Sequence, residues 1–210
     1  MTDIKEITRS NGMKYSVRSN RDRFFYPKEW LSFYDCLKES QKKTFDCLIS
    51  TGSRINELRH LKKEDIDLEN KRLILKVTKI KAAKKEKSPR PRTIPFSTQF
   101  GKRLRSYFAN MKGDEYIGIL STPAANIAMK KALIKAGIKD YQMFSIHNIR
   151  KTFITWLVAI GTDGLMVAAH CGHSPQVSAQ AYLSPDLFTH DEKVLIREIL
   201  GDLYKKQEVY

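Results

Sequence analysis

Apolar residues recur at helical spacing along most of this chain, and that periodicity limits its fold more than any other feature. From about residue 24 to residue 204, apolar side chains repeat every three or four positions, in segments that end at glycine, proline or a capping residue. The first helix is expected to open at Phe24–Pro27 and to present one apolar face, made of Trp30, Leu31, Tyr34 and Leu37. Further helices are predicted over residues 41–50, 55–61, 98–111, 122–136, 144–160, 163–170 and 186–204. Gly201 interrupts the last segment, so that helix ends either near Tyr204 or at Gly201.

The pattern changes between residues 64 and 96. Residues 65–68 alternate, 69–71 form a turn, and 73–77 read as a strand. Thr93–Phe96 reads as a short edge strand, because Pro95 cannot donate within a central ladder. The predicted fold class is therefore mostly α with a small antiparallel β-sheet (α+β). Residues 1–24 are polar and basic and are interpreted as an N-terminal tail or linker, ahead of one domain over residues 25–210.

Composition narrows the choice of partner and compartment. The 210 residues include 38 Lys and Arg against 23 Asp and Glu, a formal net charge of +15. This balance favours a polyanionic partner, nucleic acid first and an anionic membrane surface second. With no apolar run long enough to span a membrane and no signal peptide at the start, we expect a cytoplasmic protein without a membrane partner. The cysteines are too few for a disulfide framework and are interpreted as core residues in a reducing compartment: Cys36, Cys47 and Cys171.

Residues suited to phosphate chemistry gather between Ser145 and Tyr182. Ser145 is a good cap for a helix that carries His147 in its first turn and Arg150 on the same face. A helix N-terminus favours phosphate, because its N–H groups are free and its dipole end is positive. His173 follows a glycine, and Tyr182 lies nine residues later (182 − 173), near the expected end of a short helix. Because tyrosine is a covalent nucleophile and phosphoryl transfer needs positive charge on the non-bridging oxygens, the set suits attack on a phosphodiester.

These residues resemble a known family. His147-x-x-Arg150, then Gly172-His173, then Tyr182, is similar to the second motif of the tyrosine recombinases, the phage-type integrase family. The first motif of that family reads Thr-Gly-x-Arg-x-x-Glu-Leu, and residues 51–58 read Thr-Gly-Ser-Arg-Ile-Asn-Glu-Leu. Two ordered motifs and the tyrosine rarely coincide by chance. The resemblance covers about residues 26–205 and implies the fold of the recombinase catalytic domain.

The resemblance implies a role for each residue of the set. Tyr182 would attack a DNA phosphodiester and form a covalent 3′-phosphotyrosine. Arg54 and Arg150 would hold the non-bridging oxygens. His147 and His173 would hydrogen-bond the phosphate, and one of them would help to take the phenol proton. The bond energy stays in the phosphotyrosine, so the resemblance implies neither a nucleotide cofactor nor a metal.

Arg54 is expected at a corner between two helices, because Gly52 ends one and Ser53 is suited to cap the next. Glu57 lies three residues after Arg54. By resemblance it is a buried carboxylate that orients Arg54, and the alternative is an ordinary surface ion pair.

The densest positive stretch, residues 79–92, joins two of the predicted strands. By resemblance, a catalytic lysine that protonates the departing 5′ oxygen leaves the second strand about two dozen residues after the first arginine. Lys79 fits at 25 residues (79 − 54), and Lys81 and Lys84 are rivals because this loop looks long for the family. The other basic side chains are predicted to contact the DNA backbone: Lys81, Lys84, Lys85, Lys87, Arg90 and Arg92.

The remaining histidines and tyrosines match no motif. Two histidines are interpreted as surface or capping residues, His60 and His190. His170 precedes His173 by three residues, like a metal-binding pair, but no carboxylate or cysteine cluster accompanies it, so no metal site is predicted. Tyr204 and Tyr210 have no histidine at the right distance, which leaves Tyr182 as the chosen nucleophile.

The predicted function is site-specific DNA recombination or integration, as in mobile elements, on double-stranded DNA. By resemblance four protomers form a homotetramer on DNA and exchange C-terminal helices, with a docking stripe of Ile196, Ile199, Leu200 and Leu203. The alternatives are a type IB topoisomerase-like enzyme and a non-catalytic DNA-binding module of the same fold. The ~24 residues ahead of Phe25 cannot form the DNA-clamping domain usual in the family, so we expect either a catalytic fragment or a minimal integrase. Asn148 stands where Asp is commoner in the His-x-x-Arg motif.

Overall fold

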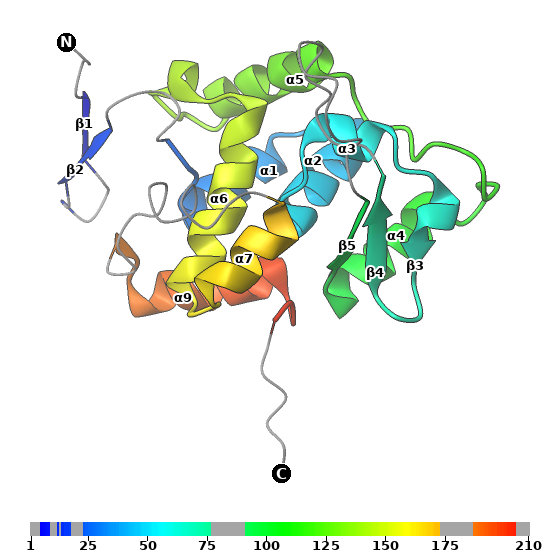
Figure 1. Ribbon diagram of the computed structural model, residues 1–210. Helices are drawn as coiled ribbons and strands as arrows, with labels where there is room; N and C mark the ends of the chain where they lie inside the picture. The colour runs from blue at the N-terminus through cyan, green and yellow to red at the C-terminus, as the bar shows by residue number, and fades with distance from the viewer. Residues whose placement is uncertain are drawn as a thin grey trace, which may run out of the picture.

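Helices form most of the protein, and a small sheet lies at one side of them (Figure 1). The computed structural model describes residues 5–8, 12, 14–17, 23–76, 91–172 and 187–204. Its helices are α1 Pro27–Asp35, α2 Glu39–Thr51, α3 Ile55–Arg59, α4 Thr98–Phe108, α5 Thr122–Lys135, α6 Ile146–Ala159, α7 Gly164–Cys171 and α9 His190–Leu200, with 3-10 turns at η2 Lys63–Asp65 and η3 Tyr141–Met143. The predicted class, mostly α with a small antiparallel sheet, is confirmed.

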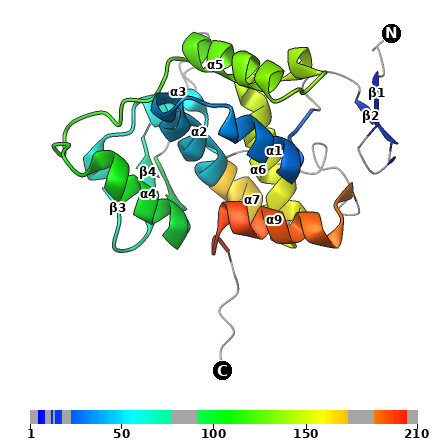
Figure 2. The same cartoon turned by 180° about the vertical axis from the view of Figure 1, so that it is seen from behind.

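The sheet beside the helices has the strand order β3-β4-β5, all antiparallel. Its strands are β3 Ile66–Asp67, β4 Arg72–Leu75 and β5 Arg92–Pro95. Pro95 lies opposite Arg72 on the edge strand β5, which is where proline was predicted. Leu73 and Leu75 are buried while Ile74 is exposed, so β4 buries one face in strict alternation. Helix α4 covers this sheet on the side that faces the viewer in Figure 2.

A separate hairpin, β1 Lys5–Thr8 paired with β2 Lys14–Val17, precedes the helices. These strands were not predicted from the sequence, because each is only four residues long and lies in a polar, basic stretch that is interpreted as a tail or linker. The packed core begins at Arg23 and Phe24, both buried, slightly before the predicted domain start at residue 25.

Helix α6 runs through the middle of the molecule and contacts α2, α5, α7 and α9 (Figure 1). Trp156 of α6 is fully buried, and its indole N–H donates to the carbonyl of Phe25 at 2.9 Å. The Phe25 ring in turn lies 5.1 Å from the Phe33 ring, so α1 is fixed against α6. The predicted apolar face of α1 is wrong by one residue, because Phe33 is buried and Leu31 is 39% exposed.

Helix α9 packs against α1, α2 and α6 of the same chain. It ends at Leu200, with Gly201 at φ +70°, so the shorter of the two predicted helices is confirmed. Beyond it, the Asp202 carboxylate accepts a hydrogen bond of 2.6 Å from the backbone N–H of Thr98 at the start of α4. The predicted docking stripe is covered by this chain's own core, since three of its members are at most 5% exposed: Ile196, Leu200 and Leu203.

All three cysteines are free thiols. Cys47 and Cys171 are buried, and Cys36 is half-buried. In the part of the chain that the structure describes, no helix combines the length and apolar character of a membrane span.

Candidate active site

The corner between α2 and α3 presents Arg54. Gly52 ends α2 at φ +57°, and a Cβ there would lie 2.1 Å from the Phe153 ring, so both backbone conformation and space require glycine. Arg54, and not the predicted Ser53, is the N-cap of α3, because the backbone N–H of Arg54 donates to the Glu57 carboxylate at 2.7 Å. The Arg54 side chain is 33% exposed, so its guanidinium lies at the surface of the corner.

Glu57 lies between two arginines. Nη1 of Arg54 donates to its Oε1 at 3.0 Å, and Arg92 donates to Oε1 and Oε2, each at 2.8 Å. Burial works to raise the pKa of Glu57, but hydrogen bonds and charge from Arg92, and then from Arg54, lower it below its usual value. The residue is only 3% exposed, so this is not the surface ion pair considered from the sequence. That Glu57 orients Arg54 stays a prediction.

The Arg92 side chain is directed into the protein. It is 14% exposed, and its Nε–H donates to the His170 carbonyl at 3.1 Å. With both terminal nitrogens on Glu57, the donors expected to contact DNA are directed into the protein. The predicted DNA-backbone contact of Arg92 is at odds with this geometry. In the sequence alone, Arg92 cannot be told apart from the other basic residues that precede it.

Helix α6 places His147 and Arg150 as its periodicity predicted. Ser145 is the N-cap, His147 lies in the first turn and is exposed, and Arg150 follows one turn later. The Arg150 guanidinium donates to the Gly52 carbonyl at 2.8 Å and to the Cys171 carbonyl. Burial lowers the pKa of Arg150, and the nearby positive charges of Arg54 and Arg92 act in the same direction. Arg150 therefore links α6 to the ends of α2 and α7.

Asn148, which stands where Asp is commoner in the His-x-x-Arg motif, makes one hydrogen bond that Asp could also make and one that it could not. Its Oδ1 accepts from the backbone N–H of Ser145 at 2.7 Å, as a carboxylate would. Its Nδ2 donates to the Arg23 carbonyl, which a carboxylate cannot do. Asn148 thus ties the start of the core to the helix that carries His147.

His170 is a buried structural histidine. Its Nε2 lies 2.8 Å from the Thr51 carbonyl, and its Nδ1 lies 2.7 Å from the Tyr204 hydroxyl. Because a carbonyl only accepts, Nε2 carries the proton and the tyrosine donates to Nδ1. Burial lowers the pKa of His170 to about 4 and raises the pKa of Tyr204 to about 12. Tyr204 is thus a poor candidate nucleophile.

Together these contacts form a compact positive centre. Arg54, Arg92 and Arg150 lie around one buried carboxylate, Glu57, so the centre carries a net charge of about +2. Within the described ranges, only Nη1 of the Arg54 guanidinium is hydrogen-bonded, so the other N–H groups of that guanidinium can meet a ligand. A site with surplus guanidinium charge and a helix N-terminus beside it is suited to bind a phosphate.

Several predicted residues lie outside the described residues. They are His173, Tyr182, Lys79, Lys81, Lys84, Lys85, Lys87 and Arg90. The described backbone extends as far as Gly172, directly before His173. Gly172 lies against Arg92, and the carbonyl of the preceding Cys171 accepts from Arg150.

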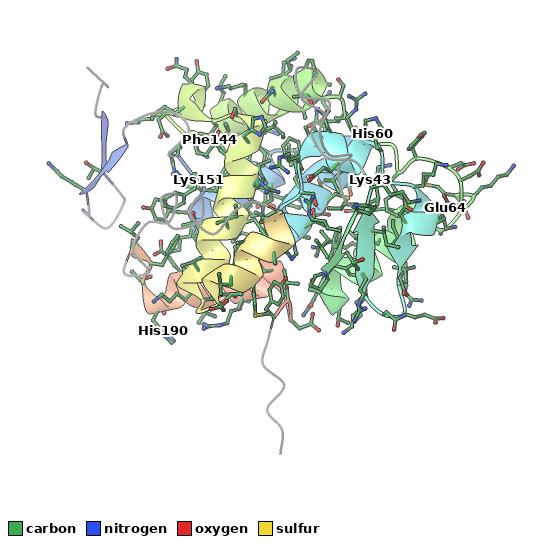
Figure 3. All side chains as sticks on the ribbon, in the orientation of Figure 1. Lys43, His60, Glu64, Phe144, Lys151 and His190 are labelled. Atoms are coloured by element: carbon green, nitrogen blue, oxygen red, sulfur yellow. The ribbon has the colours of Figure 1, made fainter. Side chains whose placement is uncertain are left out.

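Two histidines without a motif lie apart from this centre: His60 ends α3 and His190 begins α9 (Figure 3). Among the described residues, no group of three His, Cys, Asp or Glu side chains is arranged to hold a metal ion.

Comparison with known proteins identifies the family. A model of the phage integrase family matches residues 23–187. The chain is similar to the tyrosine recombinase XerC of Staphylococcus saprophyticus, with 28% identity over 171 residues, 71% of this chain and 53% of that protein. It is also similar to the tyrosine recombinase XerA of Thermococcus kodakarensis, with 26% identity over 169 residues, 74% of this chain and 56% of that protein. The chain thus spans about half the length of these curated relatives.

Solved structures agree on the fold. A crystal structure of XerA recombinase superimposes with a TM-score of 0.62 at 18% identity, over 88% of this chain and 65% of that chain. The Tn1549 transposon integrase, in complex with a circular intermediate DNA, gives 0.60 at 19% identity, over 84% and 65%. XerH site-specific recombinase, bound to its difH substrate, gives 0.57 at 19% identity, over 88% and 57%.

Proposed function

This chain belongs to the phage integrase family, and on that premise we propose that it cleaves and rejoins double-stranded DNA for site-specific recombination. The observation that supports this most is the meeting of Arg54 and Arg150 around the α2–α3 corner, with more positive than negative charge. Relatives named as tyrosine recombinases, and recombinase structures that contain DNA, favour the same substrate.

We propose that Tyr182 attacks the phosphodiester phosphorus and forms a 3′-phosphotyrosine, while the bond to the 5′ oxygen breaks. In-line attack builds negative charge on the non-bridging oxygens, and fixed guanidinium groups stabilise that charge without reorganising. Arg54 approaches from the corner and Arg150 from α6, so the two reach one phosphate from different elements. His147 of the first turn of α6 adds a donor beside the helix N-terminus.

The departing 5′ oxygen needs a proton, which we assign to Lys79, with Lys81 and Lys84 as rivals. His173 is assigned to bind the phosphate or to take the phenol proton. It directly follows Gly172, which lies against Arg92 and next to the Cys171 carbonyl that accepts from Arg150. The reverse reaction, attack of a 5′ hydroxyl on the phosphotyrosine, rejoins the strand without a metal or nucleotide.

Recombination between two duplexes requires four active sites, and we propose a homotetramer on DNA. Exchange of C-terminal helices is the less favoured way to build it, because α9 buries its stripe in its own chain. Deletion of residues 186–210 should unfold the protein if α9 acts as part of this core. If the truncated protein instead stays folded and binds DNA as a monomer, that result would favour helix exchange as the means of assembly.

The test is to trap the covalent intermediate. A pool of nicked duplexes with randomised centres would lose the short 5′-hydroxyl strand after cleavage, so an adduct that resists detergent accumulates and its DNA is sequenced. The wild-type chain should give an adduct at a defined sequence, and Tyr182→Phe should bind DNA but give none. Tyr204→Phe is the matched control and should keep the adduct, because the Tyr204 hydroxyl donates to the buried His170.

The outcomes separate the alternatives. An adduct in Tyr182→Phe would place the nucleophile elsewhere. DNA binding with no adduct in the wild-type chain would indicate a non-catalytic module. Relaxation of many supercoiled plasmids per protein monomer would indicate a topoisomerase-like enzyme.

A further inference from the structure

The contacts of Arg92 are those of a residue that supports the site from inside the protein. It begins β5, and its side chain turns inward onto a carboxylate that is itself 3% exposed. Both oxygens of Glu57 receive one Arg92 nitrogen each, at 2.8 Å, which is the paired geometry that a guanidinium fork allows. Arg54 reaches the same carboxylate with its side chain through one nitrogen only, at 3.0 Å. Arg92 is therefore the main partner of Glu57.

The same side chain also contacts the end of α7. Nε of Arg92 donates to the His170 carbonyl at 3.1 Å, at a helix C-terminus where positive charge is favourable. A Cβ on Gly172 would lie 3.3 Å from Cδ and Nε of Arg92, so the side chain lies directly against that glycine. Gly172 is followed by His173 in the chain. One side chain thus joins the carboxylate that holds Arg54 to the backbone that leads to His173.

Resting on the function proposed above, we propose that Arg92 is a positioning residue for DNA cleavage and not a DNA contact. While the Arg92 fork covers Glu57, the Arg54 guanidinium keeps a single contact with that carboxylate and has N–H groups left for the phosphate. Without Arg92, the buried carboxylate would lose its main partner and would draw the Arg54 guanidinium into a paired contact of its own. Arg54 would then turn away from the phosphate, and the end of α7 would lose its tie to β5.

The test compares Arg92→Gln, Arg92→Lys and Arg54→Ala with Arg72→Gln, a control at an exposed arginine on the neighbouring strand β4. The probe is the nicked duplex that the wild-type chain cleaves, made with either a normal linkage or a methylphosphonate at the scissile position. A methyl group in place of a non-bridging oxygen removes the charge that Arg54 would stabilise. Rates are measured in single turnover at saturating DNA, at a temperature where circular dichroism finds every variant folded.

On normal DNA, Arg92→Gln should cleave roughly 100-fold more slowly than wild type, because a small displacement of a catalytic group has that effect. Its affinity should stay within about threefold of wild type, and its salt dependence should not change, because no phosphate contact is lost. On the methylphosphonate duplex, Arg92→Gln and Arg54→Ala should both come within about tenfold of the wild-type rate. Arg92→Lys should be intermediate on normal DNA, since one ammonium cannot serve both carboxylate oxygens as a fork does.

Three results would overturn the proposal. A normal rate at saturating DNA with weaker, less salt-dependent binding would make Arg92 a backbone contact. An equal loss of rate on both linkages would mean that Arg92 only maintains the fold. Full activity of Arg92→Gln would remove it from the site. If Arg92→Gln does not fold, the same comparisons hold for Arg92→Lys. Absence of an adduct in the wild-type chain is a separate failure, that of the proposed function.

Discussion

At the scale of single residues, the corner that presents Arg54 depends on a glycine at position 52. Gly52 combines a left-handed backbone with a carbonyl that accepts from Arg150, and the Phe153 ring occupies the space where a side chain would go. The glycine of the first motif thus serves the geometry of the arginine that follows it.

Gly52→Ala should lower the free energy of unfolding by about 2–4 kcal/mol, from the left-handed conformation and the clash together. Gly137→Ala is the matched control: Gly137 has φ +72°, but no atom lies within 4 Å of the position that a Cβ would take, so it should lose only about 1–2 kcal/mol. Urea unfolding of both variants measures the difference. Equal losses would mean that Phe153 moves aside and that the space at Gly52 is not restrictive.

Lys79 is the proposed general acid of the catalytic set, and Lys81 and Lys84 are its rivals. A lysine among positive charges has its pKa lowered toward the range of a useful general acid. A duplex with sulfur at the bridging 5′ position has a leaving group that needs no proton. Lys79→Ala should therefore be slow on normal DNA and largely recovered on the sulfur duplex, while Arg54→Ala stays slow on both. Rescue of Lys81→Ala or Lys84→Ala in its place would move the general acid along the loop, and rescue of none would point to His173.

At the scale of elements, the sequence predicts the helices well because apolar spacing and caps act locally. The edge strand with Pro95 and the end of α9 at Gly201 follow from local chemistry in the same way. The roles of Arg92 and His170 do not, because Glu57 lies 35 residues from Arg92 and Thr51 lies 119 residues from His170. Nothing in a local pattern reveals a partner at that distance. The sequence of α9 likewise shows an apolar stripe but does not show whether the stripe is covered by its own chain or by a neighbouring protomer.

Helix α7 is held to the core by the neutral His170, which makes stability depend on pH. The pKa of His170 is about 4 in the folded protein against 6.5 when free, so between these values the unfolded chain binds the proton. Stability should therefore fall as the pH falls, by roughly 2 kcal/mol at most between pH 7 and pH 5.

Urea unfolding of the wild type and of His170→Gln at both pH values isolates this contribution. Glutamine keeps a donor and an acceptor but does not titrate, so the variant should lose less stability on acidification than the wild type does. Glu57 does not interfere, because its lowered pKa means that its contribution is lost only below about pH 4.5. The same pH dependence in both proteins would mean that His170 is protonated, or exposed, in the folded state.

At the scale of the whole molecule, the net charge of +15 is far larger than the net charge of about +2 at the centre around Glu57. DNA offers one negative charge per phosphate, and each phosphate neutralised by a lysine or arginine releases counterions. Charge that binds DNA must therefore be told apart from charge that only keeps the protein soluble. Salt dependence makes that distinction, because it counts contacts and not charges.

We expect the loop lysines, and not surface lysines in general, to set the salt dependence of binding. Changing Lys85 and Lys87 to Gln should make the slope of log affinity against log salt shallower by about 1.8, from two lost phosphate contacts. The control changes Lys28 and Lys38 to Gln. Both are exposed: Lys28 lies in the first turn of α1, which faces the viewer in Figure 2, and Lys38 is the N-cap of α2. The two variants have equal net charge, so a shared long-range field would change both slopes alike. A change confined to the loop variant, with its cleavage rate at saturating DNA intact, would identify Lys85 and Lys87 as backbone contacts that take no part in the chemistry.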